Sequence, residues 1–206
     1  MGESLSEQEH ANVAAAIAQA ERATAGEIRV VVLTRPLVRH PFYGLMWAAL
    51  LALVLPWPLA LLTALDTPML LSLQACAFMV AGAVLIFTPL GALTVPRFAR
   101  EEAGRTAAID HFLSLGVHQT RGRTGVLILV APADHLVEVV ADEAIHAKVG
   151  HEAWESVCAA VLAGARQGRL GDGLVAGVAV AGGLLARHVP PTAGDANELP
   201  DRMIII

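Results

Sequence analysis

Acidic residues at the end of one apolar segment are the side chains of this sequence best placed for chemistry. Glu138, Asp142 and Glu143 lie within or just after Leu136–Ala141, which we predict to be a strand. Carboxylates at the carboxyl end of a strand can converge on a cleft, and Ca²⁺ or Mg²⁺ needs several oxygen ligands. Asp142, Glu143 and Asp172 are therefore candidate metal ligands. Taken singly, they favour a structural alternative, in which Asp142 and Asp172 only cap helices or turns and Glu143 is solvated.

Other reactive side chains lack the partners that catalysis or metal binding would need. His135, His146 and His151 have no cysteine or second histidine pair beside them, which argues against a zinc site. The turn Arg121–Gly125 could hold a phosphate through guanidinium and backbone amide groups, although a basic loop near anionic lipid headgroups is the simpler interpretation. We therefore assign no catalytic residue, and the sequence leaves open whether the protein is an enzyme.

A long apolar segment, Phe42–Val95, separates the two parts of the chain that carry most of the charge. Its only formal charge is Asp66, which lies between the apolar halves Tyr43–Leu65 and Met69–Val95. Each half exceeds the roughly 20 apolar residues that cross a bilayer as a helix. A soluble helix needs a polar face, which these halves lack. We therefore predict a transmembrane helical hairpin rather than the buried hairpin of a soluble protein.

Basic residues flank this hairpin on both sides, whereas the turn between its halves contains none. Since positive residues stay on the cytoplasmic side, we expect a multi-pass protein of the cell inner membrane whose soluble part is cytoplasmic. Two spans without an ionisable side chain inside them are typical of an anchor rather than a transport pathway. The flanking residues are Arg35, Arg39 and His40 before the hairpin and Arg97, Arg100 and Arg105 after it.

The composition is typical of one soluble domain joined to an apolar insert. Of 206 residues, 55% are hydrophobic and 16% are charged, and about 150 residues lie outside the hairpin. The net charge is −5 and no basic stripe with interleaved aromatic residues occurs, which argues against nucleic acid as a partner. Met1–Gln8 is polar and acidic, which predicts no cleavable signal peptide. The expected partners are the lipid bilayer and other membrane proteins.

The order of the remaining segments predicts a single domain that the hairpin interrupts. Ser6-x-x-Glu9 is a capping box at a helix start, and the β-branched run Ile28–Leu33 predicts a strand covered on both faces. The partners of that strand must follow the hairpin, which is therefore an insertion. After it we predict a helix over Arg97–Leu115, a short strand at Val117–Gln119, antiparallel strands Val126–Ala131 and Leu136–Ala141, an irregular segment or short helix at Asp142–Gly150, helices His151–Gln167 and Gly173–His188, and a polar tail Thr192–Asp201 that ends in apolar Met203–Ile206.

This order predicts the α/β class, with a mixed-sheet α/β sandwich interrupted by a two-helix transmembrane hairpin. We place the first part of the domain at residues 1–41 and the hairpin at 42–96. The second part of the domain then covers residues 97–190, and a C-terminal tail covers 191–206.

Several segments, taken in this order, resemble the TPM domain family. The similarity covers nearly all of the predicted soluble part, about Leu5–Leu33 and Phe98–Asp201, and it implies a TPM-like α/β sandwich. Acid-phosphatase activity and divalent-metal binding are attributed to parts of the family, which implies Asp142 first and Asp172 second as site residues. The segments are Thr24–Val32, Thr124–Val130, Val137–Gly150, Gly171–Leu174 and Asn197–Asp201.

Two functions are compatible with this resemblance. The first is a membrane-anchored accessory or interaction module in membrane-protein maintenance, which the lack of a complete catalytic constellation favours. The second is a weak phosphatase that depends on Ca²⁺ or Mg²⁺ bound at Asp142, Glu143 and Asp172. An enzyme needs these acidic groups convergent in a pocket, whereas a module needs only an exposed surface.

Overall fold

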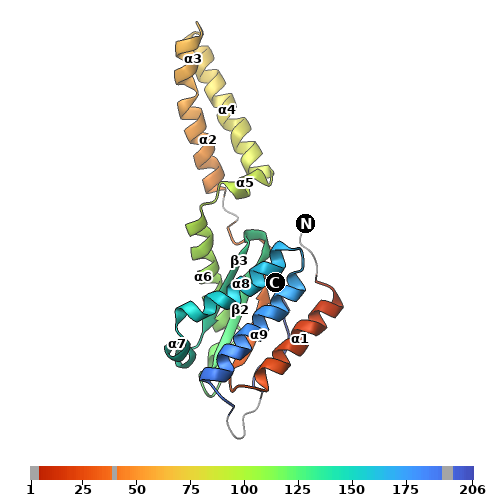
Figure 1. Cartoon of the computed structure of the whole chain (residues 1–206). Helices are drawn as coiled ribbons and strands as arrows, with labels where there is room; N and C mark the ends of the chain where they lie inside the picture. The colour runs from red at the N-terminus through yellow and green to blue at the C-terminus, as the bar shows by residue number, and fades with distance from the viewer. Residues whose placement is uncertain (1–4, 39–40, 192–196) are drawn as a thin grey trace. The chain divides into compact units, whose positions relative to one another are not determined.

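The computed structural model describes residues 5–38, 41–191 and 197–206, and it gives the backbone alone for His151. The chain forms two compact units (Figure 1). We call residues 1–37 with 101–206 the α/β unit, and residues 38–100 the helical unit. Arg39 and His40, two of the predicted flanking residues, lie outside the described residues, as does part of the predicted tail, 192–196.

A four-strand mixed sheet forms the centre of the α/β unit. Its strands are β1 (Glu27–Val32), β2 (Gly125–Ala131), β3 (Leu136–Ala141) and β4 (Ile204–Ile205), in the order β3-β2-β1-β4. β1 pairs parallel with β2 and β4, and β2 pairs antiparallel with β3 through a short turn. The predicted mixed sheet and the antiparallel pair are therefore confirmed.

Helices cover both faces of this sheet. As a consequence, β1 and β2 are buried along their whole lengths. One face, with Ile28, Val30 and Ile128, packs in a core against α1 (Glu7–Glu21), α7 (Glu143–Val149), α8 (His151–Arg166) and α9 (Leu170–His188). The other face, with Val31, Leu127 and Leu129, packs against α6 (Arg97–Ser114), whose residues from Glu101 onward belong to this unit. The alternation along β1 follows from the two-residue period of a strand.

Local signals in the sequence account for several element boundaries. Ser6 and Glu9 form the predicted capping box at α1: the Ser6 hydroxyl accepts from the Glu9 N–H at 3.3 Å, and a Glu9 carboxylate oxygen accepts from the Ser6 N–H at 2.8 Å. Asp142 precedes α7 as its N-cap, with its side chain accepting from the Glu143 N–H. Both caps satisfy amides that the first helical turn leaves unpaired.

Two predictions about local structure are wrong, and one strand was not predicted. Val117–Gln119 is a short 3₁₀ helix, η1, rather than a strand, because Gly116 turns the chain with φ 69° directly before it. Asp172 is not the N-cap of the last helix, since α9 begins at Leu170 and Arg169 is the residue before it. The apolar end of the chain, which we predicted only as the end of a tail, includes a strand that was not predicted, because Ile204–Ile205 forms β4 beside β1.

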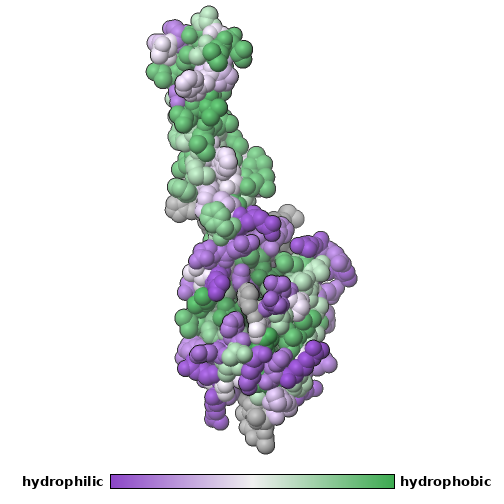
Figure 2. All heavy atoms as spheres, turned by 60° about the vertical axis from the view of Figure 1, so that its left-hand side comes forward, coloured by the Kyte–Doolittle hydropathy of each residue, from purple (hydrophilic) through white to green (hydrophobic). Residues whose placement is uncertain are grey.

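The helical unit contains α2 (Phe42–Val54), α3 (Pro56–Leu62), α4 (Thr67–Phe87) and α5 (Leu90–Leu93). Proline lacks an amide donor, which explains why the helix breaks at Pro56 and α4 ends before Pro89. α2 and α4 approach closely at small residues: a Cβ on Gly44 would lie 3.2 Å from the Leu85 Cβ. Figure 2 shows that the outer surface of this unit is largely apolar.

Within the described part of the chain, three helices are long and apolar enough to cross a membrane. Phe42–Leu62 and Thr67–Phe87 have only 11% and 6% of their apolar windows buried in the structure, against 50% for Leu170–His188. α9 carries buried residues such as Leu174 and Val178 into the core of the α/β unit. The apolar helices Phe42–Leu62 and Thr67–Phe87 differ from α9, because almost none of their residues are buried within the structure.

Candidate functional site

Asp142 lies at the carboxyl end of β3, beside the first residue of β2, and its side chain is only 6% exposed. Its backbone N–H donates to the Gly125 carbonyl at 2.9 Å, and its Oδ1 accepts from the Glu143 N–H at 2.9 Å. Oδ1 also lies 4.0 Å from Nη1 of the largely exposed Arg123. Oδ2 is buried and has no hydrogen-bond partner among the residues that the structure describes. The carboxylate is thus held by one oxygen, and its other oxygen has no partner in the described part of the chain.

The other two predicted metal ligands do not join Asp142 in the same way. Glu143 follows it directly and is exposed at the start of α7. Asp172 is exposed in the first turn of α9 and lies 3.4 Å from Nη1 of Arg169. An ion pair between exposed side chains contributes little to stability, so this pair fixes no site.

Hydrogen bonds at the end of the sheet show where Asp172 lies relative to Asp142. Asp142 is hydrogen-bonded to Gly125, and the neighbouring Thr124 donates its hydroxyl to the Ala25 carbonyl at 2.7 Å. The Ala25 N–H in turn donates to the carbonyl of Val189, the residue after α9, at 3.2 Å. Asp142 therefore lies near the C-terminal end of α9. Asp172 is in the first turn of that helix, about 25 Å away along the axis at 1.5 Å per residue. The structure brings together Asp142 and Glu143 but not Asp172.

No group of three or more His, Cys, Asp or Glu side chains that could hold a metal ion occurs among the described residues. His135 and His146 are exposed, and the side chain of His151 lies outside the described part. Ca²⁺ or Mg²⁺ at Asp142 would need oxygen ligands beyond the two neighbouring carboxylates, for example from water. Metal binding at Asp142 and Glu143 stays a prediction.

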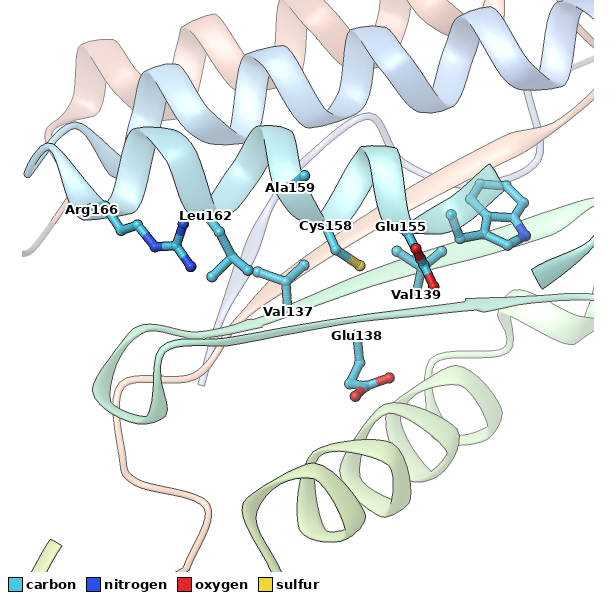
Figure 3. Close-up of a pocket in the computed structure, with 9 residues that line it drawn as sticks. Val137, Glu138, Val139, Glu155, Cys158, Ala159, Leu162 and Arg166 are labelled. Atoms are coloured by element: carbon cyan, nitrogen blue, oxygen red, sulfur yellow. The ribbon is translucent and has the colours of Figure 1, made fainter. Parts of the chain in front are cut away.

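A cleft of about 370 Å³ lies between β3 and α8. Its walls are largely apolar, and Figure 3 shows Val137 and Leu162 pointing toward each other across it, with Cys158 beside them. The Glu138 side chain points to the opposite side of the strand. Burial is the main cause that raises the pKa of the Cys158 thiol to about 11, with a smaller contribution from the Glu138 charge. The thiol is thus a poor nucleophile near neutral pH. The lining residues are Val137, Glu138, Val139, Trp154, Glu155, Cys158, Ala159, Leu162 and Arg166.

β3 forms one wall of this cleft and is also the last strand on its side of the sheet. Among the described residues no strand pairs with its outer edge. An edge strand beside an apolar cleft can accept an extended peptide, because the strand supplies hydrogen bonds and the cleft receives side chains. The arrangement is therefore suited to binding an extended segment.

Buried charged side chains at the start of β1 were not identified from the sequence. Glu27 and Arg29 are 7% and 5% exposed, and both lie in a strand that is otherwise apolar. Glu21, at the end of α1, points its Oε1 at the Ile28 N–H, which donates to it at 2.8 Å. The available signal was the pair Glu27 and Arg29 within a β-branched run, since charged residues are rarely buried unless they are paired.

Burial is the main cause that raises the pKa of Glu21 to about 8. The hydrogen bond from the Ile28 N–H acts in the opposite direction, and the nearby carboxyl groups of Glu27 and Asp201 raise the pKa further. Asp201 comes from the far end of the chain, so this acidic group exists only in the folded protein. At neutral pH Glu21 is mostly protonated.

The basic turn Arg121–Gly125 is engaged by the chain itself. The Arg121 N–H donates to the Glu198 carboxylate at 3.1 Å, and Arg123 Nη1 donates to the His118 carbonyl at 3.4 Å. One of the backbone amides that could hold a phosphate, that of Arg121, therefore already holds a carboxylate. This finding favours a structural role for the turn.

A model of the TPM domain family matches residues 89–183. Within the α/β unit this segment contains α6, β2, β3, α7, α8 and most of α9. The matched segment thus resembles the TPM domain family, and it lies within an α/β fold. The resemblance to the TPM domain family that we described from the sequence is thus confirmed.

The chain is also similar to a solved structure, the NMR structure of the BA42 protein from the psychrophilic bacterium Bizionia argentinensis. The TM-score is 0.62 at 22% sequence identity, and the similarity covers 100% of this chain and 97% of the other. At this identity the likeness supports the fold alone. A comparison with curated proteins gives no match.

Proposed function

We propose that the protein is a membrane-anchored TPM-domain module that binds other membrane proteins and assists their maintenance. The observation that carries the anchor is the exposure of the helical unit. Leu61 and Phe87 are each 84% exposed and Trp57 is 74% exposed. Removing each large apolar side chain from water contributes roughly 1.5–3 kcal/mol, so the hydrocarbon core of a bilayer is the favoured surrounding.

The geometry of the helical unit supports a hairpin that enters and leaves on one side. Gly44, near the start of α2, packs against Leu85, near the end of α4. Both ends of the hairpin then emerge at the same membrane surface, and so do the two parts of the chain that build the α/β unit. The basic residues Arg35 and Arg100 flank the hairpin, so the positive-inside tendency assigns this surface to the cytoplasm.

The α/β unit supports a binding role better than a catalytic one. Its cleft beside β3 has largely apolar walls and a thiol with a raised pKa, whereas Asp142 lies before α7 and Asp172 lies in the first turn of α9. A metal-dependent phosphatase would need these carboxylates to converge on one phosphate. We therefore propose the cleft between β3 and α8 as the surface that contacts a membrane-protein partner.

Photo-crosslinking in cells tests this role. A crosslinking amino acid at Ala159, which lines the cleft, is expected to capture a membrane protein reproducibly. The same amino acid at the exposed Glu7 in α1 is the matched control and should not capture that protein. If both positions yield the same background, or neither yields a membrane protein, the proposed role is wrong.

Membrane anchoring is tested separately by extraction of isolated membranes at alkaline pH with carbonate. We expect the full chain to stay in the membrane fraction. A variant in which residues 42–94 are replaced by a short Gly-Ser linker should be released. Release of the full chain under the same conditions would contradict the anchor.

A further inference from the structure

The C-terminal segment, residues 197–206, runs along the outer edge of β1, and buried charged side chains of β1 bind its backbone. The two carboxylate oxygens of Glu27 accept the N–H groups of Glu198 and Leu199, each at 3.1 Å. Nη1 of Arg29 donates to the Pro200 carbonyl at 2.6 Å. These contacts are all made to backbone groups of the segment, so they do not depend on its side chains.

The far end of the segment completes the sheet. The Ile206 N–H donates to the Val32 carbonyl at 3.0 Å, and the Thr34 N–H donates to the Ile206 carbonyl at 2.7 Å. Met203 is 7% exposed and belongs to the core that also contains α8 and α9, whereas Ile204 packs against the opposite core. Burial of Met203 therefore reports whether the segment is in place.

Three carboxyl groups lie close together where this segment meets α1 and β1. Glu21, on α1, is close to Asp201 of the segment and to Glu27 of β1, and these carboxyl groups raise its pKa. Its Oε2 is buried and has no hydrogen-bond partner within the described ranges. The basic groups nearby are Arg29 of β1 and Arg202 of the segment, and burial lowers the pKa of Arg29. Closure thus places three carboxyl groups around one buried guanidinium group.

We propose that residues 197–206 form a displaceable latch on the outer edge of β1, and that loss of the proton from Glu21 opens it. When the latch is closed, Glu21 needs a proton because Asp201 and Glu27 are close and water is largely excluded. When the latch is open, Asp201 moves away and Glu21 is hydrated. Opening exposes the edge of β1, whose N–H and C=O groups can then pair with another strand.

The sign and size of the pH effect follow from the two states. In the closed state the pKa of Glu21 is raised to about 8, whereas the ordinary pKa of a glutamate side chain is 4.5. A carboxyl group with a raised pKa in the closed state favours closure at low pH. The equilibrium constant for closure then falls by up to about tenfold per pH unit between pH 5 and pH 8, and it changes little above pH 8.

Oxidation of Met203 by hydrogen peroxide measures the latch in the full chain in detergent micelles. Mass spectrometry of the C-terminal proteolytic peptide gives the rate at pH 5.5, 6.5, 7.5 and 8.5, relative to a synthetic peptide of residues 197–206. We expect the relative rate to rise by up to about tenfold per pH unit. Far-UV circular dichroism at each pH reports whether the helices and strands persist.

Glu21→Gln resembles the protonated side chain and should keep Met203 protected at every pH. Asp201→Asn removes one neighbouring charge and should weaken the pH dependence. Glu7→Gln, at an exposed position of the same helix, should behave like the wild-type chain. The latch is refuted if Met203 stays equally protected from pH 5.5 to 8.5, if Glu21→Gln keeps the wild-type profile, or if exposure of Met203 coincides with loss of the dichroism signal.

Discussion

The close crossing of α8 and α9 allows a precise test of the packing that holds the α/β unit together. A Cβ on Gly164 would lie 2.4 Å from the Gly173 Cα, 2.5 Å from the Gly173 nitrogen and 2.8 Å from the Arg169 carbonyl oxygen. All three are backbone atoms, which cannot move aside as a flexible side chain can. Forcing such contacts costs about 1–3 kcal/mol, part of which is offset by the gain of up to about 1 kcal/mol when alanine replaces glycine in a helix.

Gly183→Ala in α9 is the matched control, because nothing lies within 4 Å of its added Cβ. This variant should gain up to about 1 kcal/mol of unfolding free energy, since only the helix propensity changes. Gly164→Ala should instead lose up to about 2 kcal/mol after a propensity gain of about 1 kcal/mol is subtracted, which is up to roughly 8 °C in the unfolding midpoint of a unit of this size.

Thermal unfolding is measured by the fluorescence of Trp154, which is 4% exposed in α8. The background Trp47→Phe and Trp57→Phe removes the tryptophans of the helical unit. We expect the two alanine variants to shift the midpoint in opposite directions. Equal midpoints for Gly164→Ala and Gly183→Ala would show that α8 and α9 do not cross at this separation.

Three further predictions concern the candidate site and the cleft. Asp142→Ala should lower the free energy of unfolding by about 1 kcal/mol in a denaturant titration, because the cap of α7 is lost, whereas Asp142→Asn keeps an accepting oxygen and should stay closer to the wild-type value. If Ca²⁺ or Mg²⁺ binds at Oδ2 of Asp142, a metal concentration of about 100 times the dissociation constant should raise the free energy of unfolding by roughly 2.7 kcal/mol. This stabilisation should disappear in Asp142→Asn but persist in Asp172→Asn. No stabilisation at millimolar metal would leave Asp142 as a cap. Cys158 should react with a thiol reagent at pH 8 at least about a hundredfold more slowly than a free thiol, because a pKa of about 11 leaves little thiolate, and a rate equal to that of free cysteine would contradict its burial.

Sequence patterns that depend on near neighbours predict much of the fold. The elements that they do not predict form through contacts between segments far apart in the chain. The β-branched runs at β1 and β2 and the capping box at Ser6 depend on neighbours a few residues away, so pattern reading places them within a residue. Ile204–Ile205 is a strand only because the edge of β1 lies beside it. A two-residue strand has no periodicity of its own from which it could be predicted.

The same distinction applies to the candidate site. Asp142 was predicted as either a ligand or a cap, and the cap is local and visible in the sequence. The separation of Asp142 from Asp172 depends on the direction of α9 across the sheet, which no local pattern gives. The group of Glu21, Glu27 and Asp201 likewise joins residues about 180 positions apart.

The most direct test of a membrane-inserted hairpin is the labelling of single cysteines in spheroplasts with a membrane-impermeant maleimide. In a chain with Cys76→Ala and Cys158→Ala, one cysteine replaces Asp66 in the turn between α3 and α4, and another replaces the exposed Glu7 of the α/β unit. We predict that Asp66→Cys is labelled in intact spheroplasts and that Glu7→Cys is labelled only after lysis. Labelling of Glu7→Cys before lysis, or protection of Asp66→Cys, would contradict a hairpin that spans the bilayer with the α/β unit in the cytoplasm.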